Sequence, residues 1–237
     1  MQDIEKSKLP GHVAVIMDGN GRWARFRNLP RAEGHLQGME SVRDVVTATR
    51  DLNIPFLTLY AFSKENWKRS EEEVKRLLEI LGVYLQNELP LMMEKDIRFN
   101  IVGNLSDFPK RLRHQIMDVM EKTASNRSLV LSIALSYSGR EEIVNAVKLI
   151  LNDVKKGSLK RINEKVFSRY LYTRNMPDPD LLIRTSGEMR ISNFLLWQIA
   201  YAEIYITDIL WPDFGKEAYL EALEEYTRRE RRFGSAK

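Results

Sequence analysis

The sequence predicts an α/β fold, in which a central, largely parallel sheet of six strands is flanked by helices. Six short apolar runs alternate with longer segments whose apolar residues recur every three or four positions, a pattern typical of α/β domains. The first run, Val13–Met17, is apolar without alternation, as expected of a strand buried on both faces. The chain has 237 residues, 43% of them hydrophobic, and no Pro/Gly/Ser-rich linker. We therefore expect a single domain over residues 1–237.

The predicted strands follow the apolar runs in chain order. They are Val13–Met17, Phe56–Phe62, Ile97–Val102, Leu129–Leu135, Leu181–Arg184 and Ala202–Ile206. Because helical segments separate most of these runs, we expect the strands to lie parallel, with their carboxyl ends at one edge of the sheet.

The predicted helices fill the intervals between the strands and close the chain. They are Leu36–Leu52, Glu71–Lys95, Lys110–Ser125, Glu141–Lys155, Glu164–Arg174 and Glu217–Arg232. The second of these carries the longest periodic apolar stripe, which Pro90 is expected to break or kink. Periodicity alone does not tell whether this stripe packs on the sheet or walls an apolar cleft.

Composition narrows the classes of function. The formal net charge of +4 is modest and charges of both signs are interspersed up to Arg228–Arg232, which fits an anionic substrate better than a nucleic acid. The absence of cysteine excludes disulfides, thiolate catalysis and cysteine-ligated zinc. The longest apolar stretch, Phe194–Ile206, is too short and too polar to span a bilayer, and no signal peptide is apparent. We expect a cytoplasmic protein.

The end of the first predicted strand carries the strongest chemical signal. Asp18 follows the strand directly, and Gly19, Gly21 and Arg22 come next. Glycines allow backbone N–H groups to approach phosphate oxygens, and arginine adds a planar fork of donors. A carboxylate beside phosphates requires a cation such as Mg²⁺ between them. The alternative is a simple tight turn, since Asp, Asn and Gly dominate turns; neither a Walker A loop nor a dinucleotide motif is present.

Three further polar loops follow predicted strands. Residues 63–69, 136–140 and 185–192 combine hydroxyls, amides, arginines and glycines. Because ligands of parallel sheets bind at the carboxyl edge, four such loops together predict a phosphate-binding cavity there.

With these pieces assembled, the chain resembles the cis-prenyltransferases, most closely the bacterial undecaprenyl diphosphate synthases. The resemblance rests on an ordered set of motifs that spans nearly the whole chain. The set comprises His12–Trp23, Arg31 with Gly34 and His35, Leu57–Trp67 with Arg69, Asp180–Glu188, and Arg190–Gln198 running on to Trp211–Phe214. It implies an enzyme that repeatedly condenses isopentenyl diphosphate onto an allylic diphosphate such as farnesyl diphosphate. The product would be a long Z-polyprenyl diphosphate such as undecaprenyl diphosphate, a lipid-carrier precursor used in cell-wall synthesis.

The resemblance also implies roles for individual residues. Asp18 and Asn66 correspond to catalytic positions, and Asp18 and Glu203 to ligands of Mg²⁺. The positions that correspond to substrate-binding residues are Gly19, Asn20, Gly21, Arg22, Trp23, Arg31, His35, Ser63, Lys64, Glu65, Trp67, Arg69, Arg184, Arg190, Ile191 and Ser192. A neutral amide is a very weak base, so positioning is the role we expect for Asn66. The departing pyrophosphate, or a relay through His35 and Ser63, is then the ultimate base.

The family resemblance further implies a homodimer. Glu203, with Arg232 and Gly234 near the end of the sequence, would act beside the partner subunit and complete its site. A product that partitions into lipid also implies transient contact with the membrane surface, although no segment of the sequence identifies where.

Product length would be set by the floor of an apolar cleft. The candidate floor residues are Leu81, Leu85, Leu89, Ile101, Leu131, Ile133 and Leu135. The main alternative to an enzyme is a non-catalytic accessory subunit of the same family. Such subunits typically lack the aspartate and the diphosphate cradle, which correspond here to Asp18 and to Gly19, Asn20, Gly21 and Arg22. A haloacid dehalogenase phosphatase would need a second aspartate at the position of Asn20, and no Asp-Asp pair of the trans-prenyltransferase type occurs.

Overall fold

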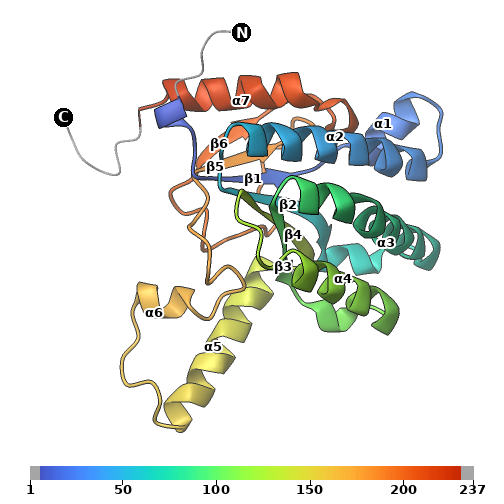
Figure 1. The fold of residues 1–237 in the computed structure, drawn as a ribbon. Helices are drawn as coiled ribbons and strands as arrows, with labels where there is room; N and C mark the ends of the chain where they lie inside the picture. Colours follow the sequence, from blue (N-terminus) through green and yellow to red (C-terminus); the bar gives the residue numbers. More distant parts are fainter. Residues whose placement is uncertain (1–5, 231–237) are drawn as a thin grey trace.

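The computed structural model describes residues 6–230 and confirms the predicted fold class (Figure 1). Six parallel strands form one sheet in the order β3-β4-β2-β1-β5-β6. The strands are β1 (His12–Ile16), β2 (Phe56–Ser63), β3 (Ile97–Gly103), β4 (Leu129–Tyr137), β5 (Leu181–Arg184) and β6 (Glu203–Ile206). All six lie within two residues of their predicted bounds, because each is a short, largely apolar run.

The register places the end of β1 at the centre of the carboxyl edge. Ile16 of β1 is level with Tyr60 of β2 on one side and with Arg184 of β5 on the other. The chain moves outward from β1 to β2 but reaches β5 on the opposite side, so the strand order reverses between β1 and β5. Ligands of open parallel sheets bind at such a reversal.

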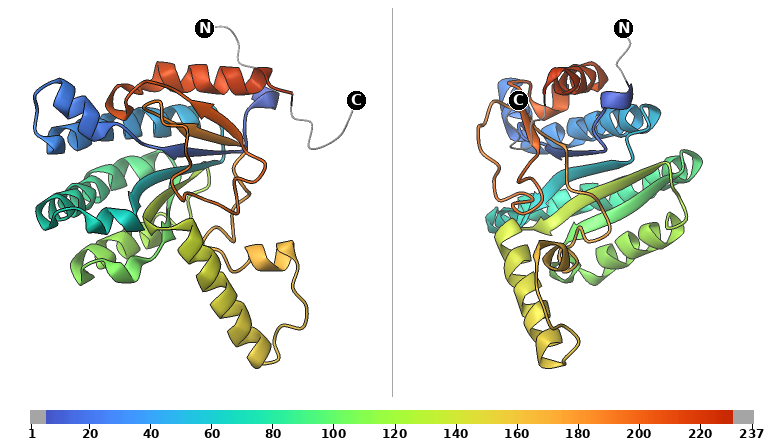
Figure 2. Two further views of the ribbon diagram at one scale, coloured as in Figure 1. Left: turned by 180° about the vertical axis from the view of Figure 1, so that it is seen from behind. Right: turned by 90° about the vertical axis from the view of Figure 1, so that its left-hand side faces the viewer.

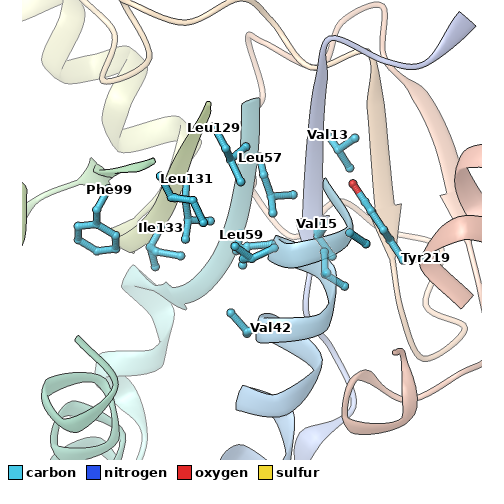
Figure 3. Packing of buried hydrophobic residues seen from close by; sticks show 14 of the residues in the cluster. Val13, Val15, Val42, Leu57, Leu59, Phe99, Leu129, Leu131, Ile133 and Tyr219 are labelled. Atoms are coloured by element: carbon cyan, nitrogen blue, oxygen red, sulfur yellow. The ribbon is translucent and has the colours of Figure 1, made fainter. Parts of the chain in front are cut away.

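Helices cover the sheet unevenly. They are α1 (Asn20–Phe26), α2 (Arg31–Asp51), α3 (Glu71–Glu94), α4 (Lys110–Lys122), α5 (Gly139–Lys155), α6 (Glu164–Ser168) and α7 (Lys216–Arg228). The main core joins α2, α3, α4 and α7 to one face of the sheet, as Figure 3 shows for Val13 and Val15 of β1 beside Val42 of α2 and Tyr219 of α7. On the other face, Ala14 and Ile16 pack with aromatic residues of β2, β4 and the segment after β5.

Several predicted helix bounds were wrong. Helix α1 was not predicted because its sequence begins like a turn, with Gly19 in the left-handed region at φ 113° immediately before it. Helix α2 begins at Arg31 rather than five residues later, because Pro30 provides its N-terminal boundary. Helix α3 continues through Pro90 to Glu94 instead of breaking. Helix α6 ends at Ser168, α7 ends at Arg228, and residues 231–237 lie outside the described part of the chain.

Helix α5 extends away from the sheet and is flanked mainly by α6 and the segment that connects them (Figure 2). Its inner positions Ala146 and Ile150 pack against Phe167 and Leu171. Across residues 6–230, no helix is long and apolar enough to cross a bilayer.

Candidate active site

A cavity of about 1200 Å³ opens at the carboxyl edge of the sheet, between the α1–α2 hairpin and α3. One end is polar and contains most of the residues that the sequence predicted for substrate binding. The predicted residues that line it are Asp18, Gly19, Asn20, Gly21, Arg22, Arg31, His35, Ser63, Glu65, Asn66, Arg69, Arg184 and Ser192. The other end is apolar, so the cavity is shaped for an anion joined to a hydrocarbon.

Asp18 is fixed through both its backbone and its carboxylate. Its N–H donates to Thr185 Oγ1 at 2.9 Å, and the Thr185 hydroxyl lies 2.6 Å from the Asp18 carbonyl oxygen. Its carboxylate accepts a hydrogen bond from Arg184 Nη2 at 2.8 Å and lies 3.5 Å from Arg22. Because the Arg184 side chain is almost fully buried, this pair gives a charged centre whose aspartate is partly open to the cavity.

Glycines allow the backbones of α1 and α2 to pack closely against each other. A Cβ atom added to Gly34 would lie 2.1 Å from the Asn20 carbonyl oxygen, so α1 and α2 approach each other only because α2 has no side chain there. A Cβ added to Gly21 would meet the Arg31 guanidinium at 3.0 Å. The two helices therefore hold Asn20, Gly21 and Arg31 together at one wall of the cavity.

His35 lies in the same wall as a neutral imidazole. Burial, followed by the charges of Arg69 and Arg31, lowers the pKa of His35 from 6.5 to about 4. Its Nε2 atom is buried and has no hydrogen-bond partner among residues 6–230. Glu73 of α3 holds both arginines, at 2.8 Å from Arg69 and 3.2 Å from Arg31. A neutral ring with a free nitrogen among arginines can donate to or accept from a phosphate group.

The loop after β2 is ordered by its own hydrogen bonds. The Asn66 side-chain oxygen accepts from the Ser63 N–H at 3.0 Å, and the Ser63 side chain accepts from the Asn66 backbone. Two predicted residues of this loop do not line the cavity. Lys64 pairs with Asp107 at 2.8 Å, and the Trp67 ring donates to Ser136 at 2.8 Å and packs in the core. These two side chains support the loop from behind.

The loop after β5 forms the facing wall. Arg184 donates to Ser192 Oγ at 2.7 Å and to the Arg190 carbonyl oxygen. The Arg190 side chain is largely exposed and pairs with Glu188. Neither Arg190 nor Ile191 lines the cavity. Ser192 and Asn193 have φ values of 47° and 62°, a strained conformation that surrounding contacts must hold.

Asn193 supplies those contacts, and the sequence analysis did not single it out. Its amide nitrogen donates to Glu65 at 3.1 Å and to Ser138 Oγ at 2.8 Å, and its amide oxygen accepts from the Arg140 N–H at 3.0 Å. Asn193 also lines the cavity. It thus joins the loops after β2, β4 and β5. Glu73 was likewise missed, because no spacing in the sequence shows that it contacts the site. Thr185 was expected only as part of the loop 185–192, without a role of its own.

Two further predicted residues lie outside the cavity. Trp23 packs under Arg27, with 4.2 Å between the guanidinium carbon and the ring centroid, and donates to Asp213 at 2.7 Å. Glu203 begins β6 and is level with Leu181 at the amino end of β5, whereas Asp18 follows the carboxyl end of β1. Glu203 pairs with Arg229 at 3.1 Å. One chain therefore does not bring Asp18 and Glu203 together.

The donor set favours one kind of metal ion. No three His, Asp or Glu side chains converge on one point within residues 6–230, so a metal enclosed by protein ligands does not fit. Mg²⁺ is commonly held by one or two carboxylates together with phosphate oxygens and water. Asp18, which faces a cavity lined by arginines and glycines, fits that mode.

The predicted floor of the cleft is corrected in part. Leu81, Ile133 and Leu135 line the apolar end, but Leu85, Leu89, Ile101 and Leu131 do not. Leu85 is fully buried in the core, and Leu131 lines a separate small cavity of about 20 Å³. Tyr84, which was not predicted, lines both cavities and separates them.

Comparisons with known proteins agree with this arrangement. Residues 16–234 match the family model described as "Putative undecaprenyl diphosphate synthase". An isoprenyl transferase of Heliobacterium mobile is 50% identical over 238 residues, which cover 100% of this chain and 92% of that protein. The Micrococcus luteus protein named ditrans,polycis-undecaprenyl-diphosphate synthase ((2E,6E)-farnesyl-diphosphate specific) is 45% identical, covering 98% of this chain and 94% of its own.

Solved structures show the same fold. Lavandulyl diphosphate synthase from Lavandula x intermedia, in complex with dimethylallyl diphosphate, has a TM-score of 0.94 and 36% identity, covering 97% of this chain and 100% of that chain. A probable undecaprenyl diphosphate synthase from Campylobacter jejuni has a TM-score of 0.80 and 33% identity, covering 95% and 99%. This chain belongs to the undecaprenyl diphosphate synthase family of prenyltransferases.

Proposed function

We propose that this prenyltransferase adds isopentenyl diphosphate repeatedly to an allylic diphosphate, farnesyl diphosphate being the starter, and releases a long Z-polyprenyl diphosphate such as undecaprenyl diphosphate. The observation that carries the proposal is a single cavity with Asp18 and a cluster of arginines at one end and an apolar floor at the other. We further propose that residues 1–237 form one catalytic domain. The accessory-subunit alternative is disfavoured, because Asp18 and the whole cradle are present.

The allylic substrate is placed along the length of the cavity. Its diphosphate lies on the backbone of Gly19 to Arg22, with Arg31 and His35 as further donors, and its hydrocarbon runs toward α3. The apolar residues available to that chain are Leu59, Phe62, Leu77, Leu78, Leu81, Tyr84, Phe99, Ile133 and Leu135. Backbone N–H groups and arginine forks favour the charge that grows on the diphosphate as its bond to carbon breaks.

Mg²⁺ is the metal we propose, held by Asp18 together with substrate phosphates. Bound there, it would neutralise the charge on the departing diphosphate. The Asp18 carboxylate accepts a hydrogen bond from Arg184 at 2.8 Å. Arg184 is therefore already oriented at the place where the second diphosphate arrives.

The diphosphate of isopentenyl diphosphate is assigned to Arg184 and Ser192, with Arg190 turning inward from its exposed pair with Glu188. Arginine matches phosphate geometry with two parallel donors, which lysine cannot do. Asn66 positions this substrate through the Ser63 turn. The proton that isopentenyl diphosphate loses passes either to the departing pyrophosphate or through Ser63 to neutral His35. The Nε2 atom of His35, which has no hydrogen-bond partner among residues 6–230, supports the second route.

The protein acts as a homodimer in this proposal, and α5 supplies the contact. Val144, Val147, Leu151 and Val154 are exposed and recur at helical spacing. They form a stripe on one flank of α5, next to the face that carries the buried Ala146 and Ile150. Glu203, Arg232 and Gly234 are proposed to act across this dimer; the last two lie outside the described residues.

Metal-dependent turnover tests the proposal. Purified protein, isopentenyl diphosphate, farnesyl diphosphate and Mg²⁺ should release pyrophosphate, and a chelator or Asp18→Ala should abolish release. Asp213→Ala is the matched control, because Asp213 is a carboxylate beside α1 that lies outside the cavity. Equal loss in both variants, or turnover by Asp18→Ala at the normal rate, contradicts the assignment.

A further inference from the structure

The tip of the α1–α2 hairpin has an unusual charge for this chain. Residues 20–32 contain four arginines and no aspartate or glutamate, although the whole chain is nearly balanced, with 37 basic and 33 acidic residues. Arg22 and Arg31 line the cavity wall already described. Arg25 and Arg27 lie on either side of Phe26 in the sequence, at the end of α1.

Two large apolar side chains are exposed at the same tip. Phe26 is 66% exposed and Leu29 is 43% exposed. The Arg25 guanidinium carbon lies 5.7 Å from the centre of the Phe26 ring. A segment that alternates exposed apolar side chains with arginines is typical of a surface that binds anionic lipid, because the rings enter the headgroup layer while the arginines meet phosphates.

The tip also borders the mouth of the cavity. Arg25, Asn28 and Leu29 belong to the cavity lining, which continues inward to the apolar residues of α3. In Figure 1 this hairpin forms one end of the molecule, and α5 extends from another part of it. Contact through the α5 stripe would therefore leave the hairpin free.

We propose that the hairpin tip, residues 25–29, docks on an anionic bilayer surface and sets the mouth of the cavity against the lipid. Phe26 and Leu29 are the inserted side chains, and Arg25 contacts lipid phosphates. Arg27 pairs with Asp213 at 3.2 Å and borders this contact. Docking would deliver a long hydrocarbon product to the bilayer, and this purpose rests on the proposed function. The docking itself does not depend on the proposed function. Arg22, Arg27 and Arg31 pair with carboxylates of other segments, which leaves Arg25 as the cation of the tip. This charge favours an anionic lipid surface over the same tip of a second copy, because two such cations would repel.

Vesicle sedimentation of the substrate-free full chain tests the proposal. More protein should sediment with vesicles that contain phosphatidylglycerol than with phosphatidylcholine alone. Phe26→Ser should weaken binding about tenfold through lost apolar burial, and Arg25→Ser about fivefold through one lost cation. Met117→Ser is the matched control, because Met117 is an exposed apolar residue on α4; it should bind like the unmodified chain.

Three results would overturn the docking proposal. The first is equal sedimentation with both kinds of vesicle, and the second is equal binding by Phe26→Ser and the unmodified chain. The third is a change of oligomeric state in Phe26→Ser by light scattering, which would assign the tip to a protein contact. Because no substrate is present, failure of the docking leaves pyrophosphate release untouched, and failure of the proposed function leaves vesicle binding untouched.

Discussion

The close approach of α1 and α2 at Gly34 leads to a prediction about both stability and activity. Alanine at this position would place its Cβ 2.1 Å from the Asn20 carbonyl oxygen, whereas real Cβ contacts under 3.0 Å essentially never occur. Helix α1 must therefore move by about 1 Å, and a misplacement of that size at a catalytic site costs on the order of 100-fold in rate. Overpacking costs about 1–3 kcal/mol and helix propensity returns about 1 kcal/mol, so we expect a net loss of up to about 2 kcal/mol.

Gly82→Ala is the matched control for Gly34→Ala. Gly82 lies inside α3, and an added Cβ would meet nothing closer than 3.4 Å, so this variant should be up to about 1 kcal/mol more stable. Denaturant unfolding measures the stability of both variants, and pyrophosphate release with farnesyl diphosphate measures the rate and the KM. If Gly34→Ala is as stable and as active as Gly82→Ala, the reasoning about the cradle is refuted.

Three further predictions concern other parts of the chain. Burial lowers the pKa of His12 from 6.5 to about 4, so its neutral form stabilises the fold fully above pH 6.5. This contribution to the unfolding free energy, about 3 kcal/mol, is lost as the pH falls toward 4. His12→Gln should make the unfolding free energy depend less on pH, and the remaining dependence is then due to His35. An unchanged slope would contradict the assignment. Asn193→Ala should raise the KM for isopentenyl diphosphate at least tenfold and leave the KM for farnesyl diphosphate nearly unchanged, because it removes the hydrogen bonds that hold the loop after β5. Equal effects on both KM values would argue for general unfolding. Tyr84→Ala should join the two cavities and lengthen the product seen by chromatography, while Tyr84→Phe should not, and an unchanged length in folded Tyr84→Ala would exclude Tyr84 as the floor.

The strands and the polar end of the site could be predicted because their signals are local. A buried parallel strand is a short apolar run, and a residue such as Asp18 that follows one must lie at the carboxyl edge. The same reasoning could have placed Glu203 at the opposite edge, because it lies near the start of the last predicted strand, Ala202–Ile206, rather than at its end. The motifs around Asp18 and Arg184 therefore located the cavity before its geometry was known.

Other features depend on contacts that spacing does not encode. The apolar stripe of α3 has one side toward the cavity and another toward the core, and only packing distinguishes Tyr84 and Leu81 from Leu85. Helix α1 was missed because its glycines favour turns locally, and its position is fixed by Gly34 from another helix. Glu73 begins a helix like any acidic residue, yet it holds two arginines of the site.

The product itself tests the central claim most directly. Purified protein is incubated with labelled isopentenyl diphosphate, farnesyl diphosphate and Mg²⁺, and the products are resolved by chain length and examined by NMR for double-bond geometry. We predict a ladder that ends at one dominant long chain, with every added double bond Z and no products in Asp18→Ala. A single condensation without further elongation, or added double bonds in the E configuration, would contradict the account.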